Sequence, residues 1–227
     1  MDEIQRILEA YRKRDINRVD ERQYRFTHYR RYTQLERERV YARVVRKYIA
    51  DISSAKIMEV GAGDGTNLAY FRDLGFYEKN IYANELRPDK CAEIGSLLPA
   101  SVVCAGNASE LSFKDEFDIC FQSTVFTSIL SDKLKREVAL KMFDMTRPGG
   151  IVLWYDFIYD NPWNKDVKGV KKAEVRKLFP GAKKITFWRV MLAPPLGRRV
   201  GVLYPVFNFL FPFLRSHIIA VIEKRAL

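Results

Sequence analysis

Three glycines at alternate positions, Gly61, Gly63 and Gly65, follow an apolar run at residues 57–60. Without a Cβ atom, a glycine adopts positive φ angles freely and lets a ligand approach the main-chain N–H groups. The apolar run predicts a buried strand, and the residues from Thr66 onward predict a helix whose positive end faces the same turn. The pattern therefore predicts a strand, turn and helix that bind a ligand through the backbone.

The spacing of the glycines narrows the choice of ligand. A dinucleotide-binding fingerprint requires a further glycine at position 66, where this chain has Thr66. Instead, Glu59 precedes the first glycine by two residues. This difference makes a nicotinamide cofactor the less favoured ligand. The competing interpretation is a glycine-rich turn that binds no nucleotide.

Polar residues stand where the neighbouring strands are expected to end. Glu85 follows the second strand and can accept hydrogen bonds from both hydroxyls of a ribose. Asn107 follows the third strand and can bond an adenine edge, while the Ala108 N–H can reach a ring nitrogen. Gln122 ends the fourth strand, close to the glycine turn. Because parallel strands end at one edge of a sheet, we expect these residues to share one site.

The elements that must position these residues alternate along the chain. Strands are predicted at residues 56–60, 80–84, 101–105, 117–122, 151–158, 184–192 and 217–223, and helices at 67–74, 87–98, 132–145 and 171–178. This alternation indicates an α/β fold with a doubly wound, Rossmann-like sheet. We expect a helical arm at residues 1–50 and one domain at residues 51–227, with an apolar cap at residues 193–215 before the last strand.

In this order the motifs resemble those of class I methyltransferases, which use S-adenosyl-L-methionine. Residues 59–65 resemble the first motif of that family, and residues 117–122 and 147–150 resemble its fourth strand and the turn before its fifth. Asn107 departs from the family, which usually has an aspartate there. The resemblance implies a seven-stranded sheet whose last strand is antiparallel. It also implies that the cofactor is held by Glu59, Gly61, Ala62, Gly63, Gly65, Glu85, Asn107, Ala108 and Gln122.

A narrower resemblance rests on residues 122–130, on 154–157 with 160–162, and on 192–195. These runs are similar to runs in bacterial methyltransferases associated with glycan and surface-polysaccharide assembly. The likeness implies O-methylation of a sugar, a glycan or another small acceptor, which can be anionic or lipid-linked. The candidate acceptor-binding residues are Asn161, Arg198, Tyr155 and His28.

A hydroxyl acceptor benefits from a general base, and the chain has two histidines, His28 and His217. If the seventh strand is antiparallel, its first residues return to the ligand-binding edge beside the end of the fifth strand. His217 would then lie near Asp156, and the two would act as a base and an orienting carboxylate. The competing interpretation is that His217 only begins a strand and bonds nearby backbone groups.

The formal charge of +11 is concentrated toward the two ends of the chain. Residues 1–51 hold 14 Lys and Arg against 9 Asp and Glu, and residues 161–227 hold 14 against 3. Basic flanks favour an anionic acceptor, membrane surface or nucleic acid, unless they form only a solvated surface. The cap is apolar on nearly all sides, so we expect it to be buried over the sheet edge or pressed against lipid.

The cysteines and the N-terminal region indicate the compartment of the protein and whether it binds a metal. Three cysteines without metal-ligand spacing and a charged N-terminal region lead us to expect a cytoplasmic protein without a metal, with at most a peripheral contact to the inner face of a membrane. The aromatic residues Tyr24, Phe26, Tyr29 and Tyr32, which alternate with arginines, either grip a ligand or anchor the arm.

Two alternative functions stay open. The basic flanks suggest an RNA methyltransferase, but the fourth strand is followed by Ser123 and Thr124 instead of an Asn/Asp-Pro-Pro-aromatic run, which makes nucleic acid the less favoured partner. A non-catalytic adenosyl-binding or membrane-associated scaffold is the other alternative.

Overall fold

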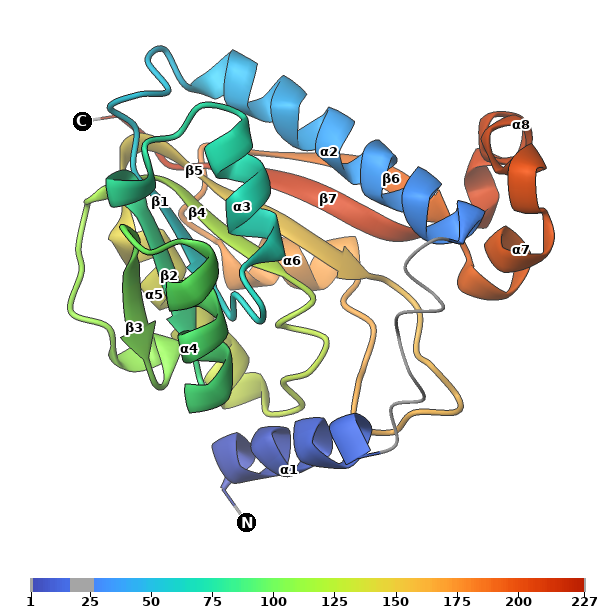
Figure 1. Ribbon diagram of the computed structural model, residues 1–227, viewed down its shortest axis with the longest axis horizontal. Helices are drawn as coiled ribbons and strands as arrows, with labels where there is room; N and C mark the ends of the chain where they lie inside the picture. The colour runs from blue at the N-terminus through green and yellow to red at the C-terminus, as the bar shows by residue number, and fades with distance from the viewer. Residues whose placement is uncertain (1, 17–26, 227) are drawn as a thin grey trace.

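The computed structural model describes residues 2–16 and 27–226, so Tyr24 and Phe26 lie outside the described part of the chain. Its centre is a seven-stranded sheet with the order β3-β2-β1-β4-β5-β7-β6 (Figure 1). The strands are β1 (Ile57–Val60), β2 (Ile81–Glu85), β3 (Val102–Ala105), β4 (Phe117–Ser123), β5 (Thr146–Phe157), β6 (Lys184–Leu192) and β7 (Arg215–Glu223). β7 pairs antiparallel with both β5 and β6, and the other pairs are parallel. The predicted fold class is confirmed.

The helices occupy the predicted segments. They are α1 (Glu3–Ile16), α2 (His28–Tyr48), α3 (Thr66–Asp73), α4 (Pro88–Leu97), α5 (Asp132–Met145), α6 (Lys172–Leu178), α7 (Pro194–Arg199) and α8 (Tyr204–Leu210). Local chemistry fixes their starts. At α5 the Ser131 hydroxyl accepts a hydrogen bond from Leu134 N at 3.3 Å, and at α4 the rigid ring of Pro88 occupies the first turn.

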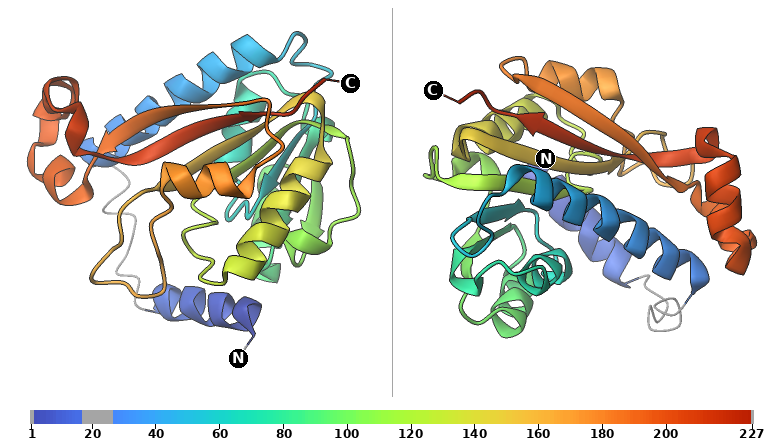
Figure 2. Two further views of the ribbon diagram at one scale, coloured as in Figure 1. Left: turned by 180° about the vertical axis from the view of Figure 1, so that it is seen from behind. Right: turned by 90° about the horizontal axis from the view of Figure 1, so that it is seen from above.

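Helices cover both faces of the sheet, as the two views of Figure 2 show. α2, α3 and α4 pack on one face, where Val44 and Phe71 meet Phe121 of β4. α5 and α6 pack on the other face, where Met142 meets Cys120 of the same strand. Because successive strand residues point to opposite faces, each central strand is apolar on both sides and contributes to both cores.

The two helices of the arm pack in different places: α1 lies across the carboxyl edge of the sheet, and α2 lies on one of its faces (Figure 1). Ile7 of α1 belongs to the core beside α5, whereas α2 belongs to the other core. Tyr29 and Tyr32 of α2 pack on Tyr204 of α8, at centroid separations of 5.8 and 5.5 Å. These two tyrosines therefore anchor the arm to the cap.

The cap projects at one end of the molecule, beyond β6 and β7 (Figures 1 and 2). It consists of α7, α8 and two short 3-10 helices at Gly201–Leu203 and Pro212–Leu214. Its inner side contacts α2 and β6, but several large apolar side chains on its outer side are exposed. The expectation of a buried cap is therefore wrong for the outer side. None of the helices in the described residues is long and apolar enough to cross a bilayer.

Candidate active site

The glycine turn between β1 and α3 has the predicted backbone. Gly61, Gly63 and Gly65 have φ angles of +66°, +59° and +76°, in the left-handed region that glycine tolerates best. A Cβ atom on Gly61 would lie 2.5 Å from Cγ2 of Val125, which follows β4. No atom lies within 4 Å of the corresponding position on Gly63. The turn is thus tight on one side and open to a ligand at Gly63.

The end of β2 holds this turn in place. Ala62 N donates to Asn84 O at 2.9 Å, and Gly63 N donates to Glu85 Oε2 at 2.8 Å. The other carboxylate oxygen, Glu85 Oε1, accepts a hydrogen bond from Arg87 N at 3.1 Å. Glu85 therefore presents an oriented carboxylate beside the turn, as expected for a group that binds ribose hydroxyls.

The end of β3 adds two further predicted residues. The Asn107 carbonyl oxygen accepts a hydrogen bond from Ser109 N at 3.1 Å, and the Asn107 amide group donates to Glu110 Oε1 at 3.1 Å. These contacts orient the Asn107 side chain at the start of a 3-10 helix, Ala108–Glu110. Asn107 and Ala108 both line the same cavity as Glu85 and the glycine turn.

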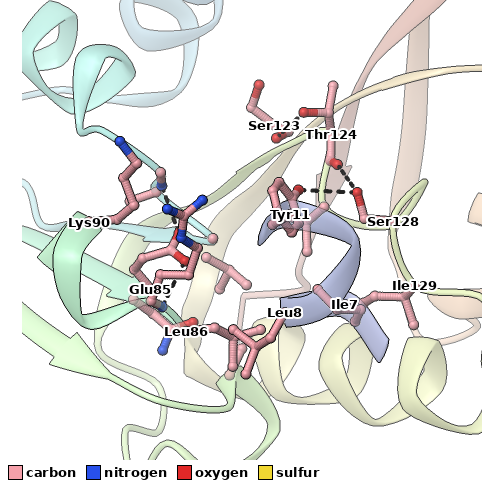
Figure 3. A pocket seen from close by; sticks show the side chains of 18 of the residues that line it. Ile7, Leu8, Tyr11, Glu85, Leu86, Lys90, Ser123, Thr124, Ser128 and Ile129 are labelled. Atoms are coloured by element: carbon pink, nitrogen blue, oxygen red, sulfur yellow. Dashed lines mark hydrogen bonds between the residues drawn. The ribbon is translucent and has the colours of Figure 1, made fainter. Parts of the chain in front are cut away.

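The cavity has a volume of about 300 Å³ and lies at the carboxyl edge of the parallel strands. Its open side is walled by α1, which contributes Ile4, Ile7, Leu8 and Tyr11 (Figure 3). No ligand contact was predicted for this helix from its sequence. The apolar residues at positions 4, 7, 8 and 11 indicate that one face of this helix is buried, but the pattern does not reveal which surface the helix covers.

Three side chains of α1, Glu3, Arg6 and Tyr11, fix this helix over the cavity. Glu3 Oε1 accepts hydrogen bonds from Leu130 N and Ser131 N at 2.6 and 3.2 Å. Arg6 donates from its guanidinium to Ser128 O at 2.6 Å, and the hydroxyls of Tyr11 and Ser128 are 3.2 Å apart. The hydrogen bond from Arg6 lowers the pKa of Glu3, against the opposing effect of partial burial, so the anchoring carboxylate is ionised at neutral pH.

Glu59 and Gly65, both predicted to bind the cofactor, do not line the cavity. Glu59 is fully buried below the turn, where it accepts a hydrogen bond from Asn67 Nδ2 at 2.8 Å. Burial raises the pKa of Glu59 well above its usual range, although the bond from Asn67 opposes the shift. Glu59 thus positions Asn67, which does line the cavity, and Gly65 is the N-cap residue that precedes α3.

Gln122 was also predicted to contact the cofactor, but it does not line the cavity and instead supports the turn beneath it. Its side chain is buried, accepts a hydrogen bond from Val125 N at 3.0 Å and donates to Asp156 Oδ2 at 2.9 Å. The second oxygen of Asp156 accepts from the Thr127 hydroxyl at 2.8 Å. Burial raises the pKa of Asp156 to about 7, although both hydrogen bonds oppose the shift. The network holds the turn after β4.

This turn also contains a strained residue that the residue pattern did not predict. Thr124 has a φ angle of +60°, which is unusual for a β-branched residue. Its backbone N–H donates to Tyr155 O at 2.8 Å, and it lines the cavity. Strain of this kind persists only where surrounding contacts impose it, and it clusters at functional sites.

The structure does not bring His217 and Asp156 together as a pair. Asp156 aligns with Ile218 across the β5–β7 ladder, whereas His217 aligns with Phe157, so the two side chains point to opposite faces of the sheet. His217 stacks on Tyr155 at 5.5 Å, and its Nδ1 lies 2.9 Å from the Ser216 hydroxyl. Burial and the positive charge of Arg37 lower the pKa of His217 to about 4. The prediction that His217 and Asp156 act together as a base and an orienting carboxylate is therefore wrong.

The predicted acceptor-binding residues are also away from the cavity. Tyr155 is buried and its hydroxyl contacts Met191 Sδ at 2.7 Å. Asn161 is exposed in the loop after β5, and Arg198 is exposed on α7. His28 stacks on Tyr32 at the start of α2. None of the four lines the cavity.

The residues that do line the cavity fit an adenosyl group. Glu85 offers acceptors for ribose hydroxyls, and the open side of Gly63 leaves room for a ligand beside the backbone. Leu86, Ala108 and Ile129 supply apolar surface suited to a purine ring. Among the described residues, no cluster of three or more His, Cys, Asp or Glu is arranged to hold a metal ion.

Comparisons with known proteins agree with this chemistry. A family model described as a methyltransferase domain matches residues 58–154, which run from β1 to β5. No curated protein sequence matches the chain. Similar solved structures include a SAM-dependent methyltransferase from Methanosarcina mazei (12% identity, TM-score 0.58, covering 81% of this chain and 98% of that one). A TehB-like SAM-dependent methyltransferase from Corynebacterium glutamicum is another (14% identity, TM-score 0.57, 87% and 98% covered).

At these identities the structural neighbours show the fold alone, whereas the family match covers the glycine turn, Glu85, Asn107 and the end of β4. Residues 58–154 therefore match a methyltransferase domain, and this match together with the fold of the neighbours indicates S-adenosyl-L-methionine as the cofactor.

Proposed function

We propose that the protein transfers a methyl group to a hydroxyl oxygen of a sugar, a glycan or another small acceptor. The observation that carries this proposal is a row of neutral hydroxyl groups on the cavity wall: Tyr11, Ser123, Thr124 and Ser128 (Figure 3). Each hydroxyl can donate and accept a hydrogen bond, which is the capacity that binds a polyol. The cavity lining also contains Arg14, Arg87 and Lys90. Arg87 pairs with Asp15 and Asp89, and Lys90 pairs with Glu93, so carboxylates partly balance this positive charge.

Bound S-adenosyl-L-methionine supplies an electrophilic methyl group on a sulfonium, which an acceptor oxygen attacks in line. The protein's main contribution to such a displacement is alignment of the two reactants and exclusion of water. Glu85 and the Gly63 backbone would fix the cofactor, while α1 closes the cavity over it. Tyr11, held by Ser128, is placed to orient an acceptor hydroxyl from this helix.

The covering of the cavity by α1 also favours an acceptor that is small, or one that reacts at the end of a longer chain. α1 is joined to the β4–α5 loop through Glu3, Arg6 and Tyr11, and Ile7 is buried beneath it. A folded nucleic acid does not fit a cavity of about 300 Å³ that is walled in this way.

One feature favours RNA as a second candidate acceptor. Arg39, Arg43, Arg46 and Lys47 form a basic surface along α2. This surface runs away from the cavity, because Tyr48 at the end of α2 donates to Glu223, which aligns with Ile151 near the start of β5. Phosphates bound there would lie toward the amino edge of the sheet, opposite the cavity.

The test joins cofactor binding to an acceptor screen. Calorimetry should show that S-adenosylhomocysteine binds the wild type and the Glu137→Ala control, an exposed change on α5, with equal affinity, whereas Glu85→Ala weakens binding at least about tenfold. Label from methyl-labelled cofactor should then pass to a hydroxyl of a sugar or lipid-linked glycan. Label incorporated into RNA instead would replace the proposed acceptor class.

A further inference from the structure

The outer side of the cap exposes a group of large apolar side chains, which we call the cap surface. Their exposed fractions run from 52% to 81%, and they are Val202, Leu203, Val206, Phe209, Leu210 and Phe213. All six lie within 12 consecutive residues. Contiguous exposed apolar surface of this kind marks a site of interaction with a protein, a ligand or a membrane.

The polarity of α8 is inverted relative to an ordinary surface helix. Its two polar side chains face the protein: the Tyr204 hydroxyl donates to Glu36 Oε2 at 2.9 Å, and Asn208 Nδ2 donates to Glu36 Oε1 at 3.0 Å. Asn208 also accepts from Arg215 Nε at 3.0 Å. Since a surface helix normally turns its apolar face inward, the outward apolar face of α8 is suited to a nonaqueous neighbour.

The cap surface is held rigidly in this orientation. Tyr204 stacks on Tyr32 with an interplanar angle of 5°, and α7 packs so closely on Tyr29 that a Cβ atom on Gly197 would overlap its ring. These contacts join the cap to α2, so the six apolar side chains cannot turn inward without breaking them. The surface is therefore preformed for its partner.

The surrounding charge identifies the partner. Residues 189–215, which comprise the cap and the strand ends beside it, contain four Arg and no Asp or Glu. Arg198 and Arg199 on α7 are exposed within this stretch. A second copy of the same basic surface would repel the first, whereas an anionic lipid surface attracts basic residues and accepts apolar side chains together.

We propose that the cap surface docks the protein on anionic bilayers, with Phe209 and Phe213 inserted at the headgroup boundary and Arg198 and Arg199 against lipid phosphates. Figure 1 shows the cap at one end of the molecule, beyond the ends of β6 and β7, where a flat surface can reach it. This docking is independent of methyl transfer, so it is measured without a methyl acceptor.

The experiment is co-sedimentation of the full chain with vesicles of phosphatidylcholine containing phosphatidylglycerol. The wild type should bind, and binding should fall when salt is raised or when phosphatidylglycerol is omitted. The Phe209→Ser/Phe213→Ser variant should bind about tenfold more weakly or worse, because two aromatic side chains no longer leave water. The Arg198→Glu/Arg199→Glu variant should lose the dependence on phosphatidylglycerol.

A matched control replaces two exposed apolar side chains elsewhere. Leu140 and Tyr77 are 60% and 56% exposed and lie outside the cap, so Leu140→Ser/Tyr77→Ser should bind vesicles like the wild type. A cooperative thermal transition shows that each variant is folded. Equal vesicle binding by the Phe209→Ser/Phe213→Ser variant and the wild type would overturn the proposal. So would light scattering showing a dimer that this variant dissociates, since the cap surface would then join two copies.

Discussion

Gly61 is fixed by two constraints that act together. Its φ angle of +66° favours glycine, and the Val125 side chain fills the space where a Cβ atom would stand. The alternate glycines indicated the first constraint from the sequence. The second arises from the turn after β4, about sixty residues later in the chain, which residue spacing cannot reveal.

Gly61→Ala should therefore lower the free energy of unfolding by about 2–4 kcal/mol, from left-handed backbone strain and overpacking. Urea unfolding measures this loss, and adding Val125→Ala should restore the part due to overpacking. The control is Gly95→Ala in α4, where no atom lies within 4 Å of the new methyl group. That change should stabilise the protein by about 0.5–1 kcal/mol. Equal stability of Gly61→Ala and the wild type would contradict both constraints.

Asp156 gives a prediction about pH. Its pKa of about 7 in the folded protein exceeds the value of 3.8 expected when unfolded. Between these values the unfolded chain releases this proton while the folded protein keeps it, so the contribution of Asp156 to stability falls as pH rises, by about 1.4 kcal/mol per pH unit. Asp156→Asn removes this contribution. The free energy of unfolding of Asp156→Asn minus that of the wild type, measured by urea unfolding, should therefore rise from pH 4 to pH 7.

The contribution of His217 to stability changes with pH in the opposite direction, so this residue serves as an internal comparison. Its folded pKa of about 4 lies below the usual 6.5, so its contribution to stability rises with pH between those values. His217→Gln should remove that rise. If Asp156→Asn and the wild type show parallel pH profiles of unfolding, Asp156 is not the buried proton carrier described here.

The predicted cofactor-binding residues that line the cavity lie at the ends of parallel strands or directly after them. Gly63, Glu85, Asn107 and Ala108 all line the cavity, because strand order and the carboxyl-edge rule need no knowledge of side-chain direction. His217 and Asp156 required the register of an antiparallel pair. A shift of one residue exchanges the two faces of a sheet, and composition does not determine that shift.

Among the elements, the strands and central helices follow from local periodicity, whereas α1 and the cap do not. α1 wraps back onto a loop more than one hundred residues later, and only tertiary packing decides which surface it covers. The cap is apolar on nearly every side, so its sequence does not show which side faces the protein. Its few polar groups, Tyr204 and Asn208, determine the outcome by bonding to Glu36.

α1 should behave as a removable wall of the cavity. Glu3→Ala deletes the acceptor for Leu130 N and Ser131 N, which should loosen the helix by about 1–3 kcal/mol. We expect faster amide hydrogen exchange in residues 3–16 and weaker binding of S-adenosylhomocysteine. Glu9→Ala is the control, because Glu9 pairs only with Arg12 and Lys13 among the described ion pairs, both in the same helix. Unchanged affinity in Glu3→Ala would mean that α1 does not help to hold the cofactor.

In the molecule as a whole, the cofactor cavity and the cap surface are separate. The cavity is walled by α1 and by the carboxyl ends of β1 to β4, whereas the cap rests on α2 and β6. No cap residue lines the cavity. This separation lets one rigid domain fix its cofactor and present an apolar, basic end to a surface.

The separation makes a prediction for the Phe209→Ser/Phe213→Ser variant. Saturating S-adenosylhomocysteine at a hundredfold excess over Kd should stabilise the wild type by about 2.7 kcal/mol, a rise in Tm of roughly 5–10 °C. The variant should show the same rise, since distant substitutions add within about 0.5 kcal/mol. A smaller rise would mean that the cap and the cavity are coupled through α2. An equal rise in a variant that no longer binds vesicles would establish that the two surfaces act independently.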